Sequence, residues 1–168
     1  MFNRGLAYLG QGVFYLAFAT LIGVFANGPA YTHFPPDRAQ IKISFSHGGK
    51  HKGGCHKRTR AELAALAPNM RRPTSCPRER VPLYFELNMD GKELLAVSLP
   101  PSGLFKDGQA RIYKLLKVKP GRHVLVLRLR DSERTEGFDY ESTEVVTLKP
   151  LQNLVIDFRP VAGGFVVL

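Results

Sequence analysis

The sequence lacks the motifs by which catalytic and nucleic-acid-binding proteins are usually recognised. It has no G-x-S-x-G or Cys–His pattern around a candidate nucleophile such as Cys55 or Ser102, and no glycine-rich phosphate loop before a helix. It also has no RNA- or DNA-binding signature with interleaved aromatic residues. We therefore expect a non-enzymatic protein, without a cofactor, a nucleic-acid partner or a small-molecule substrate.

Charged residues are absent from residues 6–26, LAYLGQGVFYLAFATLIGVFA. As a helix these residues would rise about 31 Å, roughly the thickness of the hydrocarbon core of a bilayer. We predict that residues 1–26 are a transmembrane anchor. Two alternatives stay open: a signal peptide cleaved after Ala26, since Val24 and Ala26 have the spacing of a cleavage site, and a buried helix of a soluble protein.

The flanks of this segment predict its orientation. Arg4 and the α-amine precede it, whereas Arg38 is the first basic residue after it. We expect a single-pass protein of the bacterial inner membrane, with its C-terminal domain in the periplasm. Residues 27–38, NGPAYTHFPPDR, would form an extended tether that Pro35 and Pro36 stiffen.

Residues 39–168 have the pattern of one β domain. Ile41, Ile43 and Phe45 alternate with polar residues, and Asp90-Gly91 is a strong hairpin signal between two further strands. About seven strands are predicted, over residues 40–46, 81–89, 92–99, 110–118, 123–130, 142–148 and 153–158, the last two forming a hairpin. Their spacing predicts an all-β fold, an antiparallel β-sandwich of immunoglobulin-like or prealbumin-like type. The apolar tail, GGFVVL, would be an edge strand or a segment that docks on a partner.

Acidic residues are scarce: 14 Asp and Glu stand against 24 Lys and Arg, a formal net charge of +10. Outside the cytoplasm such a surface suits anionic lipid headgroups or an acidic protein face, although it can also serve solubility alone. Four arginines fall within ten residues, with Pro73 and Pro77 between them. This predicts a preorganised docking surface, the alternative being a solvated loop; its residues are Arg71, Arg72, Arg78 and Arg80.

Only two cysteines are present, Cys55 and Cys76. In an oxidising compartment such a pair predicts a disulfide, and closing this loop would stabilise the fold by about 3 kcal/mol. The enclosed segment contains a capping box, Thr59 and Glu62, and predicts a short helix over residues 62–67. A c-type haem site is excluded because the C-x-x-C-H motif is missing.

The segment HGGKHKGGCHK, read as a loop, carries the one set of residues with the chemistry of metal ligands. His47, His51, Cys55 and His56 offer imidazole and thiolate donors that suit copper or zinc. The alternative is that the histidines are exposed and that Cys55 is oxidised, in which case it cannot be a thiolate ligand. A periplasmic copper-binding or metal-delivery protein is therefore the second functional hypothesis.

Several strings resemble a known group of proteins: CHKRTRAELAALAPNMRRPTSCPRER, LPPSGLFKDG, LRLRDS and NLVIDFRPVAGGF. Over residues 55–165 the chain resembles a family of small, uncharacterised membrane-anchored proteobacterial proteins associated with loci for haem-copper oxidases and c-type cytochromes. The resemblance implies an accessory subunit of an integral inner-membrane complex, respiratory and related to cytochrome oxidase. The string VKPGRHVLVLRLRD is also similar to part of prealbumin-like and PEGA-type domains, which bind partners without catalysis.

Overall fold

The computed structural model describes residues 2–28 and 34–168, so residues 29–33 of the predicted tether lie outside the described residues. The chain divides into two compact units, residues 1–35 and 36–168. The first contains helix α1, Phe2–Ala26, none of whose span from Arg4 to Ala26 is buried. This helix is long and apolar enough to cross a membrane, or to be a signal sequence.

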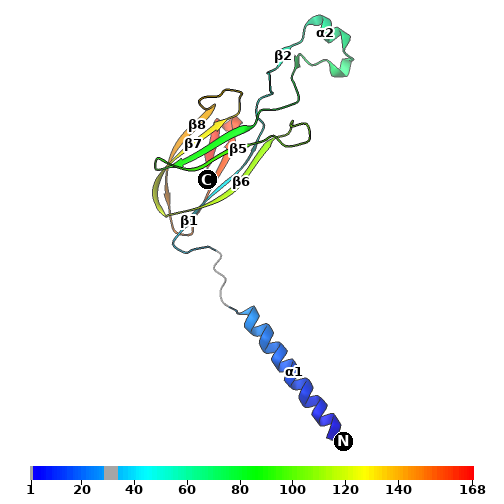
Figure 1. Cartoon of the computed structure of the whole chain (residues 1–168), viewed down its shortest axis with the longest axis vertical. Coiled ribbons are helices and arrows are strands. Elements are labelled where there is room, and N and C mark those ends of the chain that lie inside the picture. The colour runs from blue at the N-terminus through cyan, green and yellow to red at the C-terminus, as the bar shows by residue number, and fades with distance from the viewer. Residues whose placement is uncertain (1, 29–33) are drawn as a thin grey trace. The chain divides into compact units, whose positions relative to one another are not determined.

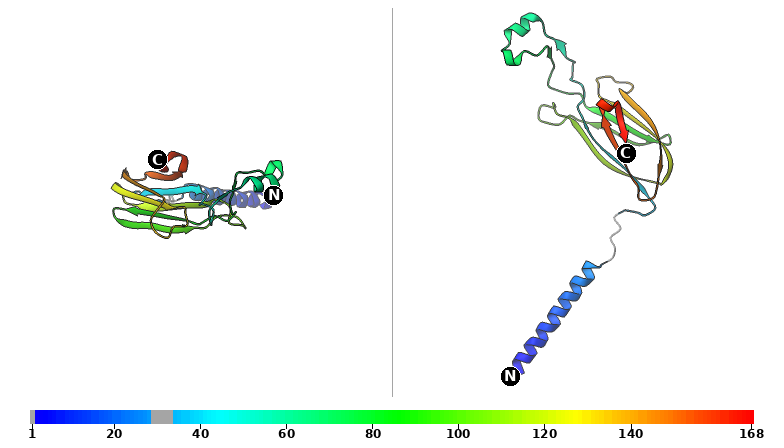
Figure 2. Two further views of the ribbon diagram at one scale, coloured as in Figure 1. Left: turned by 90° about the horizontal axis from the view of Figure 1, so that it is seen from above. Right: turned by 180° about the vertical axis from the view of Figure 1, so that it is seen from behind.

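The second unit is built mainly from two four-stranded sheets (Figures 1 and 2). The first sheet has the order β10-β9-β1-β6, with bounds Gly164–Val167, Asn153–Arg159, Ala39–His47 and Ala110–Val118. The second has the order β5-β4-β7-β8, with bounds Lys92–Leu99, Leu83–Met89, Gly121–Arg130 and Tyr140–Leu148. The single-turn helix η2, Pro160–Ala162, joins β9 to β10.

The two sheets pack face to face because each presents an apolar inner face at every second residue. Ile41 and Ile43 of β1 are buried in the same core as Phe85 of β4 and Leu127 of β7. Phe45 and Phe85 meet across the sheets with ring centroids 5.4 Å apart. The alternation read from the sequence is thus confirmed, and the second unit is mostly β.

Strand pairing corrects two predictions. β1 pairs with β9 in parallel, for example Ile41 with Leu154, so the first sheet is mixed rather than antiparallel. The predicted last hairpin is also wrong, because β8 and β9 belong to different sheets and the turn at residues 149–152 crosses between them. Turn residues reveal that the chain reverses, but a pairing of strands more than 100 residues apart leaves no local signal.

Two other expectations are confirmed. Asp90 and Gly91 both have positive φ, 54° and 79°, and form the hairpin turn between β4 and β5. The tail forms the edge strand β10, antiparallel to β9 with Phe165 opposite Phe158. This pairing accounts for the apolar character of the tail, so the alternative prediction, a free segment that docks on a partner, is not needed to explain it.

A histidine joins the β4–β5 turn to β7. The Nδ1 atom of His123 lies 2.6 Å from Oδ2 of Asp90, and its Nε2 atom lies 2.9 Å from the carbonyl oxygen of Lys119. Both ring nitrogens face acceptors, so the protonated imidazole is favoured. The hydrogen bond to Asp90 raises the pKa of His123 despite partial burial, and the hydrogen bonds from His123 and the Val124 amide lower the pKa of Asp90.

We predict a pH-dependent contribution of this pair to stability. The His123 part is complete below the ordinary histidine pKa of about 6.5 and is lost as pH rises through the raised pKa. The Asp90 part is present above the ordinary aspartate pKa and is lost as pH falls through the lowered one. His123→Gln should therefore lower the free energy of unfolding more at about pH 5.5 than at about pH 9. Urea titrations of both proteins at both pH values measure this, and an equal loss at both would contradict it.

Candidate functional site

The connection between β1 and β4, residues 48–82, leaves the sheets and forms a long arm (Figures 1 and 2). Within it lie a two-stranded ribbon, helix α2 and the single-turn helix η1. Their bounds are His56–Lys57 for β2, Thr74–Ser75 for β3, Arg60–Ala65 for α2 and Pro68–Met70 for η1. The arm carries nine Lys and Arg against two Glu residues, so its net charge is +7 of the total +10.

The far part of the arm, residues 55–76 or the distal loop, is held by a covalent bond and polar contacts. Cys55 and Cys76 form the predicted disulfide, and next to it β2 pairs with β3. The predicted capping box is present: the Glu62 amide donates to Thr59 Oγ1, and the Thr59 amide donates to the Glu62 carboxylate. No residue of α2 or η1, all of them described, is buried. The distal loop therefore takes nothing from the apolar core.

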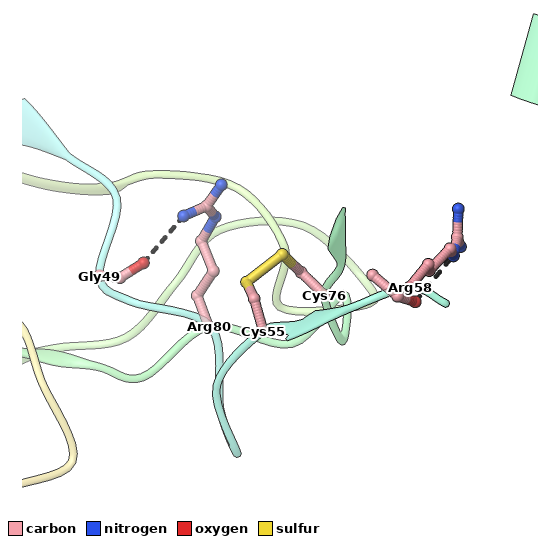
Figure 3. Close-up of a disulfide and its surroundings, with 6 residues drawn as sticks. Gly49, Cys55, Arg58, Cys76 and Arg80 are labelled. Atoms are coloured by element: carbon pink, nitrogen blue, oxygen red, sulfur yellow. Dashed lines mark hydrogen bonds between the residues drawn. A yellow bond between two sulfur atoms is a disulfide. The ribbon is translucent and has the colours of Figure 1, made fainter. Parts of the chain in front are cut away.

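The two sides of the base of the arm are joined to each other and to the loop of residues 100–109. The Val81 amide donates to the Lys50 carbonyl at 2.9 Å, and the Arg80 guanidinium donates to the Asp107 carbonyl at 2.9 Å. The same guanidinium donates to the Gly49 carbonyl at 2.8 Å (Figure 3). A Cβ atom at Gly49 would collide with the Val81 carbonyl, so this close approach requires glycine. The Arg80 guanidinium therefore has a structural role, which is to hold the arm in place.

A second anchor lies in the buried carboxylate of Asp131, which is 4% exposed. His47 Nε2 lies 2.9 Å from Asp131 Oδ2, and the Lys50 ammonium lies 3.5 Å from both Asp131 and Asp139. Asp139 in turn accepts hydrogen bonds from the amides of Asp131 and Ser132. This network ties the end of β1 to the loop after β7, so His47 has a structural partner.

Between the base and the distal loop lies an open hollow of about 470 Å³, which we call the arginine hollow. Four arginines line it, and the described side chains around it include a single acid, Asp107. The full lining is His51, Arg58, Arg72, Thr74, Ser75, Cys76, Pro77, Arg78, Arg80 and Asp107. A hollow with this excess of guanidinium groups suits a carboxylate or phosphate ligand.

The arginines of the hollow differ in how they are held. Arg78 Nη2 lies 2.8 Å from Asp107 Oδ2, which lowers the pKa of Asp107, and its guanidinium stacks 4.7 Å from the centre of the Phe105 ring. Arg58 donates to the Arg72 carbonyl and to Ser75 Oγ, both at 3.3 Å. The hollow therefore combines braced guanidinium groups with the exposed side chain of Arg72.

The four arginines predicted to dock do not all line the hollow. Arg72, Arg78 and Arg80 line the hollow, but Arg71 lies outside it and donates to the Leu66 carbonyl at 3.1 Å. Sequence reasoning missed Arg58, which the disulfide and the β2–β3 pairing bring next to Pro73 and Arg72. Its only signal was its position two residues after His56, within the loop that the cysteines close.

The predicted metal ligands are also only partly brought together. Among the described residues, the His, Cys, Asp and Glu side chains whose ligand atoms lie within 4.8 Å of one another as a group are His51, Cys55 and Cys76. His47 belongs to the Asp131 network instead, and His56 lies on β2 opposite Ser75. Cys55 is in a disulfide, so the predicted set of four cannot bind metal through a Cys55 thiolate in this state.

Comparison of the chain with protein-family models, with curated proteins and with solved structures finds no match. The candidate site is therefore described from its own geometry.

We predict that the disulfide orders the distal loop without holding the sheets together. Replacing Cys55 and Cys76 by Ser should abolish hydrogen-exchange protection in residues 55–76 and leave it intact in β1 and β4. The melting temperature should fall by no more than about 5 °C, because the freed loop regains entropy in the folded state as well. Comparing oxidised and reduced wild type provides the matched control. Loss of protection in β1 or β4 would mean that the arm and the sheets unfold together.

Proposed function

We propose that this protein is a non-catalytic accessory subunit that docks on an integral membrane complex of the bacterial inner membrane. In this proposal α1 is a retained anchor, and residues 36–168 lie in the periplasm. The complex is respiratory and related to cytochrome oxidase, as the family resemblance implies. The two packed sheets support an immunoglobulin-like or prealbumin-like sandwich, a scaffold whose loops commonly carry partner contacts.

The observation that carries the proposal is the arm. The arm is more than 30 residues long, and neither of its helices, α2 and η1, contains a buried residue. It therefore contributes little to the stability of its own domain. It nevertheless contains most of the net charge of the chain, and its base is braced by Arg80 and by the Asp131 network. A braced and basic projection loses little conformational entropy when it binds, which favours docking.

The arginine hollow defines the chemistry of the docking partner. Arg78 is already paired with Asp107, but Arg58 and Arg72 face the same hollow without a second acid among the described residues around it. Guanidinium groups bind carboxylates through paired hydrogen bonds. We therefore assign an acidic loop of a membrane-protein subunit as the ligand, with anionic lipid as the outcome to be tested against it.

Charge reversal in the hollow should weaken docking. In the full-length tagged protein, purified in mild detergent at low salt, Arg72→Glu with Arg78→Gln should reduce recovery of the partner complex by at least about tenfold. The Gln side chain can still donate to Asp107. The difference from wild type should shrink as ionic strength rises, because exposed charges are screened.

The matched control is Lys114→Glu with Arg122→Gln, which changes the charge equally at exposed positions on β6 and β7. It should recover the complex like wild type. Equal recovery by both variants at every salt concentration would place the docking surface elsewhere. Wild type that is purified alone, and that binds vesicles containing anionic phospholipid in an Arg72-dependent way, would replace the protein partner by lipid.

A further inference from the structure

The disulfide of the distal loop has a histidine beside it. One imidazole nitrogen of His51 and the sulfur atoms of Cys55 and Cys76 all lie within 4.8 Å of one another. The Nδ1 atom of His51 is buried and has no hydrogen-bond partner in the described structure. Buried polar atoms are nearly always satisfied, so an unpaired nitrogen on an imidazole that lies beside two sulfur atoms calls for a physical explanation.

The backbone places His51 at this point. His51 forms an isolated bridge with Arg80, which fixes it to the base of the arm. Its carbonyl then accepts a hydrogen bond from the Gly54 amide at 3.0 Å, in a turn where Gly53 and Gly54 both have φ of +74°. Glycine adopts this conformation readily, and the turn returns the chain so that Cys55 lies near His51.

The sulfur atoms can be reached from outside. Cys55 and Cys76 are both exposed, and Cys76 lines the arginine hollow together with His51. A second hollow, of about 380 Å³, lies along the disulfide and is lined by Gly53, Gly54, Cys55, His56, Ser75, Cys76 and Pro77. A dithiol reductant and an ion can both approach such a disulfide, as neither sulfur lies in the core.

We propose that reduction of this disulfide creates a metal site in which His51, Cys55 and Cys76 bind one Cu(I) ion. An external dithiol supplies two electrons and two protons: its own sulfur atoms become a disulfide, and the Cys55–Cys76 bond breaks to give two thiols. Binding of the ion then releases the two thiol protons. A metal about 2.3 Å from each sulfur needs the sulfur atoms only roughly 4 Å apart, so the required movement is small.

Charge and ligand number both favour Cu(I). Two thiolates and one imidazole are soft or borderline donors, and three of them satisfy Cu(I), whereas structural zinc sites use four. A Cu(I) ion with two thiolates carries a net charge of −1. The arginines of the hollow, which adjoin Cys76, stabilise that anion and the thiolates themselves.

Binding of Cu(I) would be a second function of the arm. It does not depend on docking to a membrane complex. It uses Cys76, which the metal hypothesis from the sequence omitted, and it excludes His47 and His56. The docking experiment above requires neither reductant nor copper, so failure of one proposal leaves the other standing.

The test uses the full-length protein in detergent under anaerobic conditions. Oxidised and dithiol-reduced samples, freed of reductant, are titrated with Cu(I) in competition with a chromophoric Cu(I) chelator. We expect one Cu(I) per reduced chain and none per oxidised chain, with a sulfur-to-metal signal in X-ray absorption of the reduced sample. Equal binding by both samples would overturn the proposal.

Two histidine variants separate the new site from the neighbouring residues. His51→Gln should weaken Cu(I) binding by at least about tenfold, whereas His56→Gln, next to Cys55 in the sequence, should bind like wild type. The reverse order, or no effect of His51→Gln, would overturn the assignment of His51. A parallel titration with zinc tests the choice of metal, and zinc that excess Cu(I) cannot displace would overturn it. Hydrogen exchange in β1 and β4 verifies that each variant is folded.

Discussion

The contact between the inner faces of the two sheets positions every other part of the second unit. Each of the strands β1, β4, β7 and β9 contributes an alternating set of apolar side chains to one core. Burying such side chains is the largest favourable term in folding a domain of this size. Once the sheets are packed, the ends of β1 and β4 are fixed in space, and with them the base of the arm that connects the two strands.

The arm follows different physical rules from the sheets. Its distal loop has no share in the core, so its order comes from a covalent bond, a capping box and charged hydrogen bonds. The polar contacts are individually weak and depend on pH and salt, and the disulfide depends on the redox state, in ways that a buried core does not. The part of the second unit that carries most of its net charge is therefore held mainly by contacts outside the core, which suits the docking role proposed for it.

The disulfide and the proposed docking surface share one small region. Cys76 lines the same hollow as Arg58, Arg72 and Arg78, so opening the disulfide would change the order of this surface, and metal binding would then change its charge. In the oxidised state the distal loop presents the guanidinium groups in one arrangement. In the reduced state the sulfur atoms become ligands beside His51, and a bound ion would take over the role of the covalent closure.

The sequence alone determined the features that arise from local patterns. These are the apolar N-terminal helix, the β character of the domain, the hairpin at Asp90-Gly91, the capping box at Thr59 and the Cys55–Cys76 pair, since only two cysteines were present to pair. Tertiary structure alone decided the parallel pairing of β1 with β9, because contacts between distant segments depend on how the core closes. It also decided which side chains share a site. Three contacts do not follow from spacing along the chain: the Asp131 network that holds His47, the hydrogen bond from Arg58 to the Arg72 carbonyl, and the approach of Cys76 to His51. Each needs a fold in three dimensions to bring the residues close together.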